Sequence, residues 1–428
     1  MRIIRLGNME SKEEVLKPFI NRNKFEQVES IDSKVEKIIK EVRDKGDIGL
    51  ISLTNKFDKV LLKDIKVTND EINQSIKQVE KNFLDILEEA KKNIWQFHEI
   101  QLQQSWFVNK GVDITLGQKV SSIDRVGIYV PGGKAAYPST VLMNSIPARV
   151  AGVESIAMVT PPSKYGKVNP YILAAAKISG IDEIYKVGGA QSIAALAYGT
   201  ETIKPVNKIV GPGNTYVARA KRKVFGNVDI DMVAGPSEIC IIADSNAESR
   251  LVAADLLSQA EHDELASSML ITTSLTFAKE VSKEVEMQLS ELKRKDIAQK
   301  SMEKYGVIFV LDSIEQAFEL SNEIAPEHLE IMLDNPFKYL SKVKNAGAIF
   351  LGAYSPEPLG DYFAGPNHTL PTSGTAKFSS PLGVDDFIKK SSIIYYGKEA
   401  LGKVKDQIIT FAEKEGLEGH GNSIKVRF

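Results

Sequence analysis

The 428-residue sequence has a single cysteine, Cys240, and only five histidines. One cysteine cannot form a disulfide within the chain, so the composition suits a reducing compartment such as the cytoplasm. The lack of thiolates also means that any metal site must be built from His, Asp, Glu or Gln side chains. With so few histidines, each can be considered separately: His98, His262, His328, His368 and His420.

The sequence also lacks an excess of one charge and a long apolar run. Its 54 Lys and Arg nearly balance 56 Asp and Glu, whereas proteins that bind nucleic acid or a membrane surface usually carry a basic excess. No apolar run approaches the roughly 20 residues that span a bilayer, and the first residues do not resemble a signal peptide. We therefore expect a globular cytoplasmic protein, with no nucleic acid and no membrane among its partners.

The dominant pattern is a short β-branched run followed by glycine and then by a helical stretch. Strands are predicted at 126–130, 155–160, 183–187, 208–210, 239–243, 268–273, 305–310 and 348–351. Helices are predicted at 140–151, 171–179, 313–322 and 400–414. Such an alternation is typical of parallel sheets with helices on both faces. We predict an α/β fold with two Rossmann-like, doubly wound parallel-sheet domains.

A chain of this length is expected to form more than one domain. We predict that residues 126–236 form one α/β domain, inserted between residues 26–125 and 237–380, which together form the other. Residues 1–25 and 381–428 are predicted to be small helical extensions at the two ends. The C-terminal extension can pack on its own body or reach a second subunit, and the pattern leaves both arrangements open.

The segment 258–262, with Gln259 and His262 three residues apart, is the clearest local candidate for a metal site. We expect it on a helix that begins with a capping box of Ser245 and Glu248. Residues three apart on a helix share one face, so both side chains can reach one ion. The alternative is an ordinary helix surface with a Gln and a His, which is the commoner case for such a pair.

The adjacent Glu327 and His328 form a second candidate. Pro326 suits the first turn of a helix and Glu327 suits the positive end of its dipole, which explains the segment without any chemistry. The functional interpretation is a proton-handling pair, in which the histidine takes a proton from an alcohol and the carboxylate activates water.

The remaining histidines lie in less regular surroundings. Residues 359–374 contain three glycines and two prolines, which predicts an irregular loop of the kind that often carries sites. In this loop Asp361 is a candidate metal ligand, and His368 either contacts a substrate or satisfies the backbone of a turn. His420 lies between two glycines, a weak indication of a ligand on a flexible segment. His98 is predicted to be a partly buried structural histidine.

Two glycine-rich turns, at 187–192 and 210–215, follow predicted strands and precede helical patterns. Backbone N–H groups at such helix starts can bind phosphate, which makes the turns candidates for dinucleotide binding. The G-x-G-x-x-G fingerprint is absent, because Tyr216 occupies the position of its last glycine.

Together these segments closely resemble the histidinol dehydrogenase family, from about Val35 to the C-terminus. The order of many short blocks makes the resemblance specific, since a chance match to one is plausible and a match to all is not. The matching stretches are 129–133, 137–144, 188–191, 211–214, 231–238, 258–262, 326–329, 360–372 and 415–417, followed by His420.

The resemblance implies a zinc-dependent, NAD-linked oxidoreductase. Such an enzyme oxidises L-histidinol through L-histidinal to L-histidine, the last step of histidine biosynthesis, and reduces two NAD. One zinc ion per subunit would be held by Gln259, His262, Asp361 and His420, which would also contact the substrate. By the same resemblance, His328 would be the general base and Glu327 would activate water for the second oxidation.

The resemblance also implies further contacts. Ser237, His368 and Glu415 would bind the substrate together with His328 and the zinc ligands, so residues 26–125 and 237–380 would carry most of this site. NAD would be held by Tyr129, Gln191 and Asn214 in the inserted domain. Family members are homodimers with shared active sites, in which the C-terminal extension crosses so that Glu415 and His420 complete the neighbour's site.

Three other functions remain compatible with these residues. A relative could use the same zinc and NAD on another small alcohol, although the presence of Glu327, His328, His368 and Glu415 favours histidinol. A zinc hydrolase would use a similar ligand set, but it would not need the two glycine-rich turns. A non-catalytic binding protein would be expected to lack at least one of the candidate ligands or the base.

Overall fold

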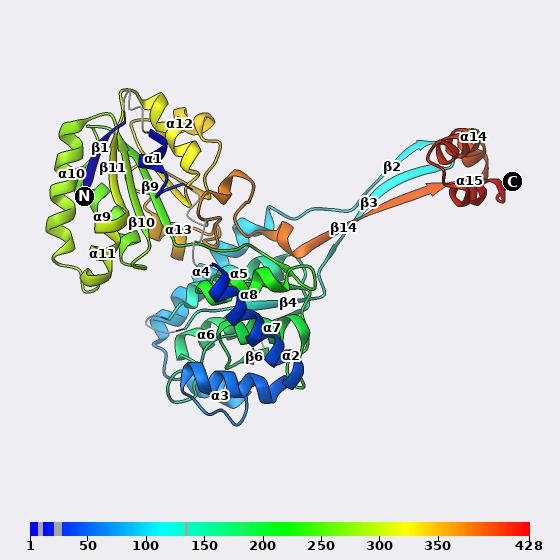
Figure 1. The fold of residues 1–428 in the computed structure, drawn as a ribbon, viewed down its shortest axis with the longest axis horizontal. Helices are drawn as coiled ribbons and strands as arrows, with labels where there is room; N and C mark the ends of the chain where they lie inside the picture. Colours follow the sequence, from blue (N-terminus) through cyan, green and yellow to red (C-terminus); the bar gives the residue numbers. More distant parts are fainter. Residues whose placement is uncertain (7–11, 21–27, 133–135, 182) are drawn as a thin grey trace.

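The computed structural model describes residues 1–6, 12–20, 28–132, 136–181 and 183–428. Figure 1 shows two bodies, each built on a sheet, and an arm that extends away from them and carries the C-terminus at its far end. The sheets of the two bodies are parallel, with six and five strands, and the three-stranded sheet of the arm is antiparallel. We call them sheet A, sheet B and sheet C, in that order.

Sheet A has the strand order β1-β11-β10-β9-β12-β13. From β9 the chain adds β10 and β11 on one side and then β12 and β13 on the other, which is a doubly wound arrangement. The strands are β1 (Arg2–Arg5), β9 (Glu238–Ala243), β10 (Ser267–Thr272), β11 (Gly306–Val310), β12 (His328–Met332) and β13 (Ala348–Leu351).

Helices cover both faces of sheet A because its strands are buried on both sides. Ile239 and Ile241 of β9 pack toward α9, α10 and α11, whereas Cys240 and Ile242 pack toward α1 and α12. The elements of this body are α1 (Lys12–Leu16), α9 (Ser249–Ala260), α10 (Leu275–Leu289), α11 (Lys295–Tyr305), α12 (Ile314–Ile324), η1 (Pro336–Lys342) and α13 (Glu357–Tyr362).

Sheet B has the order β6-β5-β4-β7-β8 and is parallel. Its first strand again lies inside: β5 and β6 are added on one side of β4, and β7 and β8 on the other. One face packs against α4, α5 and α6, and the other against α2, α7 and α8. The strands are β4 (Arg125–Tyr129), β5 (Ser155–Val159), β6 (Glu183–Tyr185), β7 (Lys208–Val210) and β8 (Asp229–Ile230). The helices are α2 (Val28–Asp58), α3 (Asn69–Ile76), α4 (Lys81–Glu99), α5 (Pro138–Val150), α6 (Pro170–Ile178), α7 (Gly189–Tyr198) and α8 (Thr215–Val224).

The arm consists of sheet C and two terminal helices (Figure 1). β3 lies in the middle of sheet C and pairs with β14 along its whole length. The elements are β2 (Trp106–Gly111), β3 (Ile114–Ser122), β14 (Ile388–Tyr396), α14 (Lys398–Lys414) and α15 (Glu418–Lys425), and the short helices η2 (Thr375–Lys377) and η3 (Val384–Phe387) precede β14.

The two doubly wound sheets confirm the predicted fold, and each predicted strand is found within two residues of its expected ends. The division of the chain needs a correction, because α2, α3 and α4 belong to the body of sheet B and not to that of sheet A. The apolar stripe of α2, which includes Val35 and Val42, packs against α7, and α4 packs against α5. The predicted N-terminal extension also contributes β1 to the edge of sheet A.

Two local predictions are wrong. The segment that begins at Pro326 is not the start of a helix: α12 ends at Ile324, Ala325 adopts a left-handed conformation with φ of 53°, and the chain enters β12. β12 pairs with a strand on each side, so the sheet overrides the local helix signals. The capping box of Ser245 is absent, because α9 begins after Glu248 and has no side-chain cap.

Within the described part of the chain, no helix is both long enough and apolar enough to cross a membrane. His98 is fully buried on α4, in line with a structural role, and its Nδ1 lies 2.8 Å from the carbonyl oxygen of Ile94.

Candidate active site

The candidate catalytic residues lie at the amino-terminal edge of sheet A. His328 is the first residue of β12 and pairs opposite Ile239, the residue that follows Glu238 at the start of β9. Helix α9 follows β9 and returns the chain toward the same edge, so Gln259 near its end comes close to these strand starts. Ligands of doubly wound sheets usually bind at the carboxyl ends of strands, so this site departs from the common location.

Nδ1 of His328 lies 2.9 Å from the carbonyl oxygen of Glu238. A carbonyl can only accept a hydrogen bond, so Nδ1 carries the proton and Nε2 of the neutral ring is the basic nitrogen. Among the described residues, Nε2 has no hydrogen-bond partner, and it lies 4.0 Å from Oδ1 of Asp361. Burial lowers the pKa of His328 to about 4. The ring is therefore neutral at pH 7 and able to accept a proton.

Glu327 is held beside this histidine by the backbone of β9. Its Oε2 accepts the N–H of Glu238 at 2.9 Å and lies 3.7 Å from Nδ1 of His328. Burial raises the pKa of Glu327 well above its usual value, although the hydrogen bond from Glu238 acts in the opposite direction. A buried carboxyl with a raised pKa, held beside a histidine, is a candidate for general acid–base chemistry.

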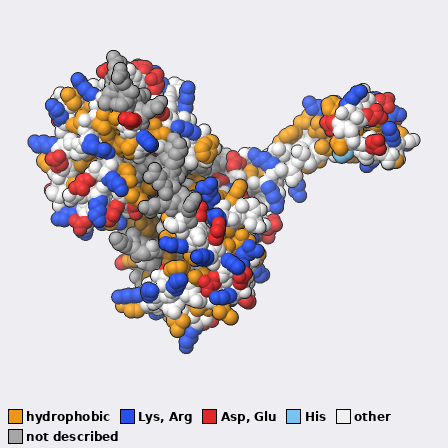
Figure 2. Space-filling view, viewed as in Figure 1, with side chains coloured by type: hydrophobic (Ala, Val, Ile, Leu, Met, Phe, Trp, Pro, Cys, Tyr) orange, Lys and Arg blue, Asp and Glu red, His pale blue; other side chains and the backbone are white. Residues whose placement is uncertain are grey.

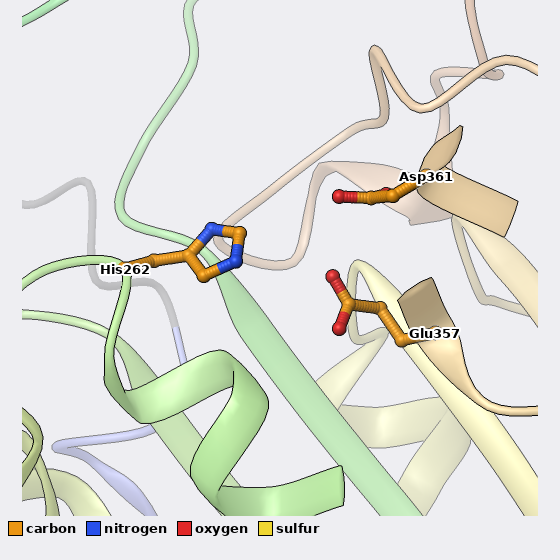
Figure 3. A group of neighbouring side chains, drawn as sticks. All are labelled: His262, Glu357 and Asp361. Atoms are coloured by element: carbon orange, nitrogen blue, oxygen red, sulfur yellow. The ribbon is translucent and has the colours of Figure 1, made fainter. Parts of the chain in front are cut away.

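His262, Glu357 and Asp361 form a cluster suited to a metal ion. Each offers one ligand atom, and these three atoms lie within 4.8 Å of one another. Figure 3 shows the ring of His262 and the two carboxylates pointing toward a common space. The carboxylates come from α13, whereas His262 lies in the turn just after α9, which ends at Ala260 and not beyond His262 as expected. Burial, together with the charge of Asp361, raises the pKa of Glu357 to about 7, and burial raises that of Asp361 to about 6.

Two further candidate residues, Gln259 and His368, have limited exposure to solvent. Gln259 is fully buried, and neither atom of its amide group has a hydrogen-bond partner in the described residues. Such an amide is costly unless something binds it. Nδ1 of His368 lies 3.1 Å from the carbonyl oxygen of Asp361, and burial lowers the pKa of His368 to about 4. Ser237, which is half-buried, directly precedes β9 at this edge.

A cavity of about 940 Å³ opens beside these groups. His328, Asp361 and His368 line it on the side of sheet A. Asp231 lines it from the segment that leaves sheet B, and Asp386 from η3. The cavity is therefore bounded by residues of both bodies, with His328 among its walls.

Within one chain, Glu415 and His420 are not brought to this site. Both are exposed, and Figure 1 shows α14 and α15 at the far end of the arm, away from α9 and α13. The structure thus brings His262 and Asp361 together, buries Gln259 near the end of α9, and leaves the fourth predicted ligand, His420, on a projecting segment.

The candidate cofactor residues line a second cavity, of about 800 Å³, at the carboxyl ends of the strands of sheet B. Tyr129 ends β4, and its hydroxyl accepts the N–H of Gly189 at 3.4 Å. Gln191 lies in the first turn of α7. Asn214 caps α8, where its Oδ1 accepts the N–H groups of two following residues. The reversal of strand order between β4 and β7 is where a doubly wound sheet usually binds its ligand.

The tight turns of this cavity depend on glycine. Gly189 has φ of 64°, and a Cβ there would lie 2.6 Å from Oε1 of Gln191. Gly211 has φ of 112°, and a Cβ there would lie 2.2 Å from the carbonyl oxygen of Tyr129. Both positions need a residue without a side chain.

Glu357 is the functional candidate that the sequence interpretation missed. It stands four residues before Asp361, so the spacing on a short helix would have indicated it. Its N–H donates to Oε1 of Glu330 at 2.9 Å, and its Oε2 accepts the hydroxyl of Ser258 at 3.1 Å. The sequence does not predict that Glu330 is buried, because the buried strands of a parallel sheet usually carry apolar side chains.

The fold and these two sites define a two-domain α/β protein with a histidine–carboxylate site on one sheet and a cavity at the carboxyl ends of the strands of the other. The family model of histidinol dehydrogenase matches residues 21–428. The chain therefore belongs to the histidinol dehydrogenase family.

Similar proteins agree with this assignment. The chain is 55% identical over 428 residues to a histidinol dehydrogenase of Clostridium acetobutylicum, covering 100% of this chain and 99% of that protein. It is 56% identical over 400 residues to one of Bacillus thuringiensis, covering 94% and 93% of the two chains. The crystal structure of histidinol dehydrogenase from Elizabethkingia anophelis superposes with a TM-score of 0.94 at 39% identity, covering 100% of this chain and 98% of that one.

Proposed function

We propose that this protein oxidises L-histidinol through L-histidinal to L-histidine and transfers two hydrides to two molecules of NAD. The observation that carries the proposal is the neutral ring of His328, whose basic nitrogen faces Asp361. The chain also belongs to the histidinol dehydrogenase family. The relatives named histidinol dehydrogenase, which match 94–100% of the chain, support the choice of substrate.

Zinc is the metal that we propose for the cluster. Gln259, His262 and Asp361 would hold it from this chain, with His420 reaching it from a second copy. The fit is supported by the buried amide of Gln259, which has no partner among the described residues, and by the closeness of His262 and Asp361. Oxygen and nitrogen donors are normal for an open catalytic zinc site. When bound, zinc would fix the imidazole and amino nitrogens of the substrate and so orient the reacting carbon.

The side chains then have distinct tasks. Nε2 of His328 accepts the proton of the alcohol as the first hydride leaves, because the carbonyl of Glu238 fixes the proton on the other nitrogen. Glu327 accepts a proton from the water that adds to the aldehyde, before the second hydride leaves. Ser237, His368 and Glu415 contact the substrate. The burial of Glu327 and His328 keeps bulk water away from the aldehyde.

NAD binds in the cavity of sheet B in this proposal, held by Tyr129, Gln191 and Asn214. The proposal is supported by the location at the reversal of strand order between β4 and β7 and by the turns that only glycine can form. N–H groups at the start of α7 suit the pyrophosphate.

We propose a homodimer in which each arm crosses to the other subunit, so that Glu415 and His420 complete the neighbour's site. The arm carries exposed apolar side chains, including Phe107 at 61%, Ile394 at 74% and Phe411 at 73% exposure. Surfaces of this kind usually bind a partner. The space-filling view shows the arm standing clear of both bodies (Figure 2).

The proposed compartment is the cytoplasm. Cys240 is fully buried in β9, and burial raises the pKa of its thiol to about 12. A buried, protonated thiol is a poor nucleophile, so we assign Cys240 no catalytic role.

The test is NADH production by the purified protein with L-histidinol and NAD, before and after chelation and again after zinc is added. Two NADH per histidinol, lost on chelation and restored by zinc, is the expected result. One NADH per histidinol would remove the water-activating role of Glu327. No turnover of histidinol with bound NAD and zinc would contradict the proposed substrate.

A further inference from the structure

The cavity of sheet B lacks an acidic residue at the place where dinucleotide-binding domains usually have one. In such domains an acid at the carboxyl end of the second strand binds the hydroxyls of the adenosine ribose. The corresponding strand here is β5, which ends at Val159 and is followed by Thr160, Pro161 and Pro162. The two prolines line the cavity, but this corner of the sheet supplies no carboxylate.

A carboxylate enters the cavity from outside the sheet instead. Asp58 is the last residue of α2, the long helix that covers α7 and α8, and it lines the cavity together with Phe57 and Tyr129. Its Oδ2 is buried, and no hydrogen-bond donor reaches it from the described part of the chain. Burial raises the pKa of Asp58, and the charge of Asp58 contributes to the raised pKa of Tyr129.

The other carboxylate of the cavity wall is already engaged. Glu41 also belongs to α2, and its Oε1 lies 3.1 Å from Nζ of Lys45. Among the cavity-lining residues that the structure describes, Asp58 therefore offers the carboxylate oxygen that still lacks a donor. A buried charged acceptor without a donor gains free energy when a ligand supplies one.

We propose that Asp58 binds the ribose hydroxyls of the dinucleotide and thereby makes the cavity select NAD over NADP. A ribose 2′-hydroxyl can donate to Oδ2, whereas a 2′-phosphate has no proton to donate and brings a like charge toward the carboxylate. The proposal rests on the NAD site proposed above. It assigns to α2, a helix outside the doubly wound sheet, the role that an acid at the end of β5 usually has.

The opposite selection is also chemically conceivable, because Lys34, Lys37 and Lys56 lie on the same wall. All three are exposed, and long exposed ammonium groups bind phosphate as mobile point charges. They would serve the pyrophosphate of either dinucleotide. If they instead bound a 2′-phosphate, the wild-type protein would bind NADP more tightly than NAD, which would overturn the proposal.

The test is the affinity of the zinc-loaded enzyme for NAD and for NADP, measured by calorimetry without substrate. Asp58→Asn keeps the shape and removes the charge, so we expect NAD affinity to fall roughly ten-fold and the preference for NAD over NADP to fall further. Asp58→Glu keeps the charge and should retain most of the preference. Asp64→Asn is the matched control, because Asp64 is an exposed aspartate six positions along that does not line the cavity.

The outcomes separate this proposal from the proposed function. If the wild type binds neither dinucleotide, the proposed cofactor is wrong and the role of Asp58 with it. If it binds NAD, and Asp58→Asn leaves the ratio of the two affinities unchanged, only the role of Asp58 is wrong. Zinc content and the thermal unfolding midpoint of each variant, measured in parallel, exclude a general loss of structure as the cause.

Discussion

Nδ1 of His328 and the carbonyl oxygen of Glu238 lie 2.9 Å apart, across the two neighbouring strands β12 and β9. This contact fixes both the orientation of the ring and the nitrogen that carries its proton. The basic nitrogen is thereby directed into the region of Asp361. The pairing of the two strands therefore sets the tautomer of His328 that the proposed chemistry needs.

The first prediction concerns the free nitrogen of this ring. In His328→Asn the amide can still donate to the carbonyl of Glu238, but the basic Nε2 is lost. We expect the turnover of histidinol to fall by about 10²–10⁴-fold, with zinc content and NAD affinity unchanged. Steady-state NADH formation and metal analysis test this.

His98→Asn is the matched control for this variant. His98 is equally buried but lies on α4 and bonds to its own helix through Ile94. It should lower the free energy of unfolding by about 1–3 kcal/mol and leave the turnover of the folded protein unchanged. Equal losses of activity in both variants would show that His328 has only a structural role.

The second prediction concerns Glu357, which lies with His262 and Asp361 around the space shown in Figure 3. Removal of its charge in Glu357→Gln should weaken zinc binding by about 10–100-fold, the usual effect of a lost supporting carboxylate. The measurement is zinc per subunit after dialysis against a chelator of known affinity. Glu286→Gln on the exposed side of α10 is the control, and equal zinc retention in both variants would exclude Glu357 from the metal site.

Much of the fold can be predicted from the sequence because its signals are local. The buried strands of both sheets are short β-branched runs, as at Ile239–Ile242. Such runs predict buried strands of a parallel sheet wherever they occur. The arm had no such signal. All six residues of β2 are exposed and most of β14 is exposed as well, so no alternation of apolar and polar residues marks them as strands.

The site was predictable where residue type alone suggests chemistry. Gln259, His262 and Asp361 stood out because few side chains bind metals and histidines are scarce here. Glu357 did not, since a glutamate on a short helix is ordinary until its burial is known. The strand that begins at His328 was hidden because Pro326 and Glu327 are also favourable at the start of a helix. Only the pairing of β12 with β9 and β13 decides between them.

The third prediction is a pH dependence of stability. Oε2 of Glu183 lies 2.7 Å from Nη2 of Arg125, and the hydrogen bond from Arg125 lowers the pKa of Glu183 from 4.5 to about 2. A lowered pKa stabilises the folded state above the unfolded value, and this stabilisation is lost as the pH falls through the folded value. The window of loss is therefore between pH 4.5 and about 2.

Glu183→Gln removes the contribution of the ion pair to the free energy of unfolding. Because the Glu183 carboxylate is partly exposed, solvent screening limits this contribution to about 1 kcal/mol at pH 7. Urea unfolding at a series of pH values should show a difference from the wild type that shrinks below pH 4.5. Glu291→Gln, at an exposed position after α10, is the control. A difference that stays constant down to pH 3 would assign the effect to packing instead of charge.

The last prediction tests the crossing of the arms. His328→Asn inactivates the site on the body of its own subunit, and His420→Asn inactivates the site to which its arm contributes. If arms cross, a mixed dimer of the two variants contains one site with both residues intact and one with both replaced. Random mixing after reversible unfolding makes half of the dimers mixed, so about a quarter of the wild-type activity should return from two inactive proteins. If each arm instead folds back on its own body, every site in the mixture lacks one residue and no activity returns. The distance of α15 from α13 within one chain favours the first result (Figure 1).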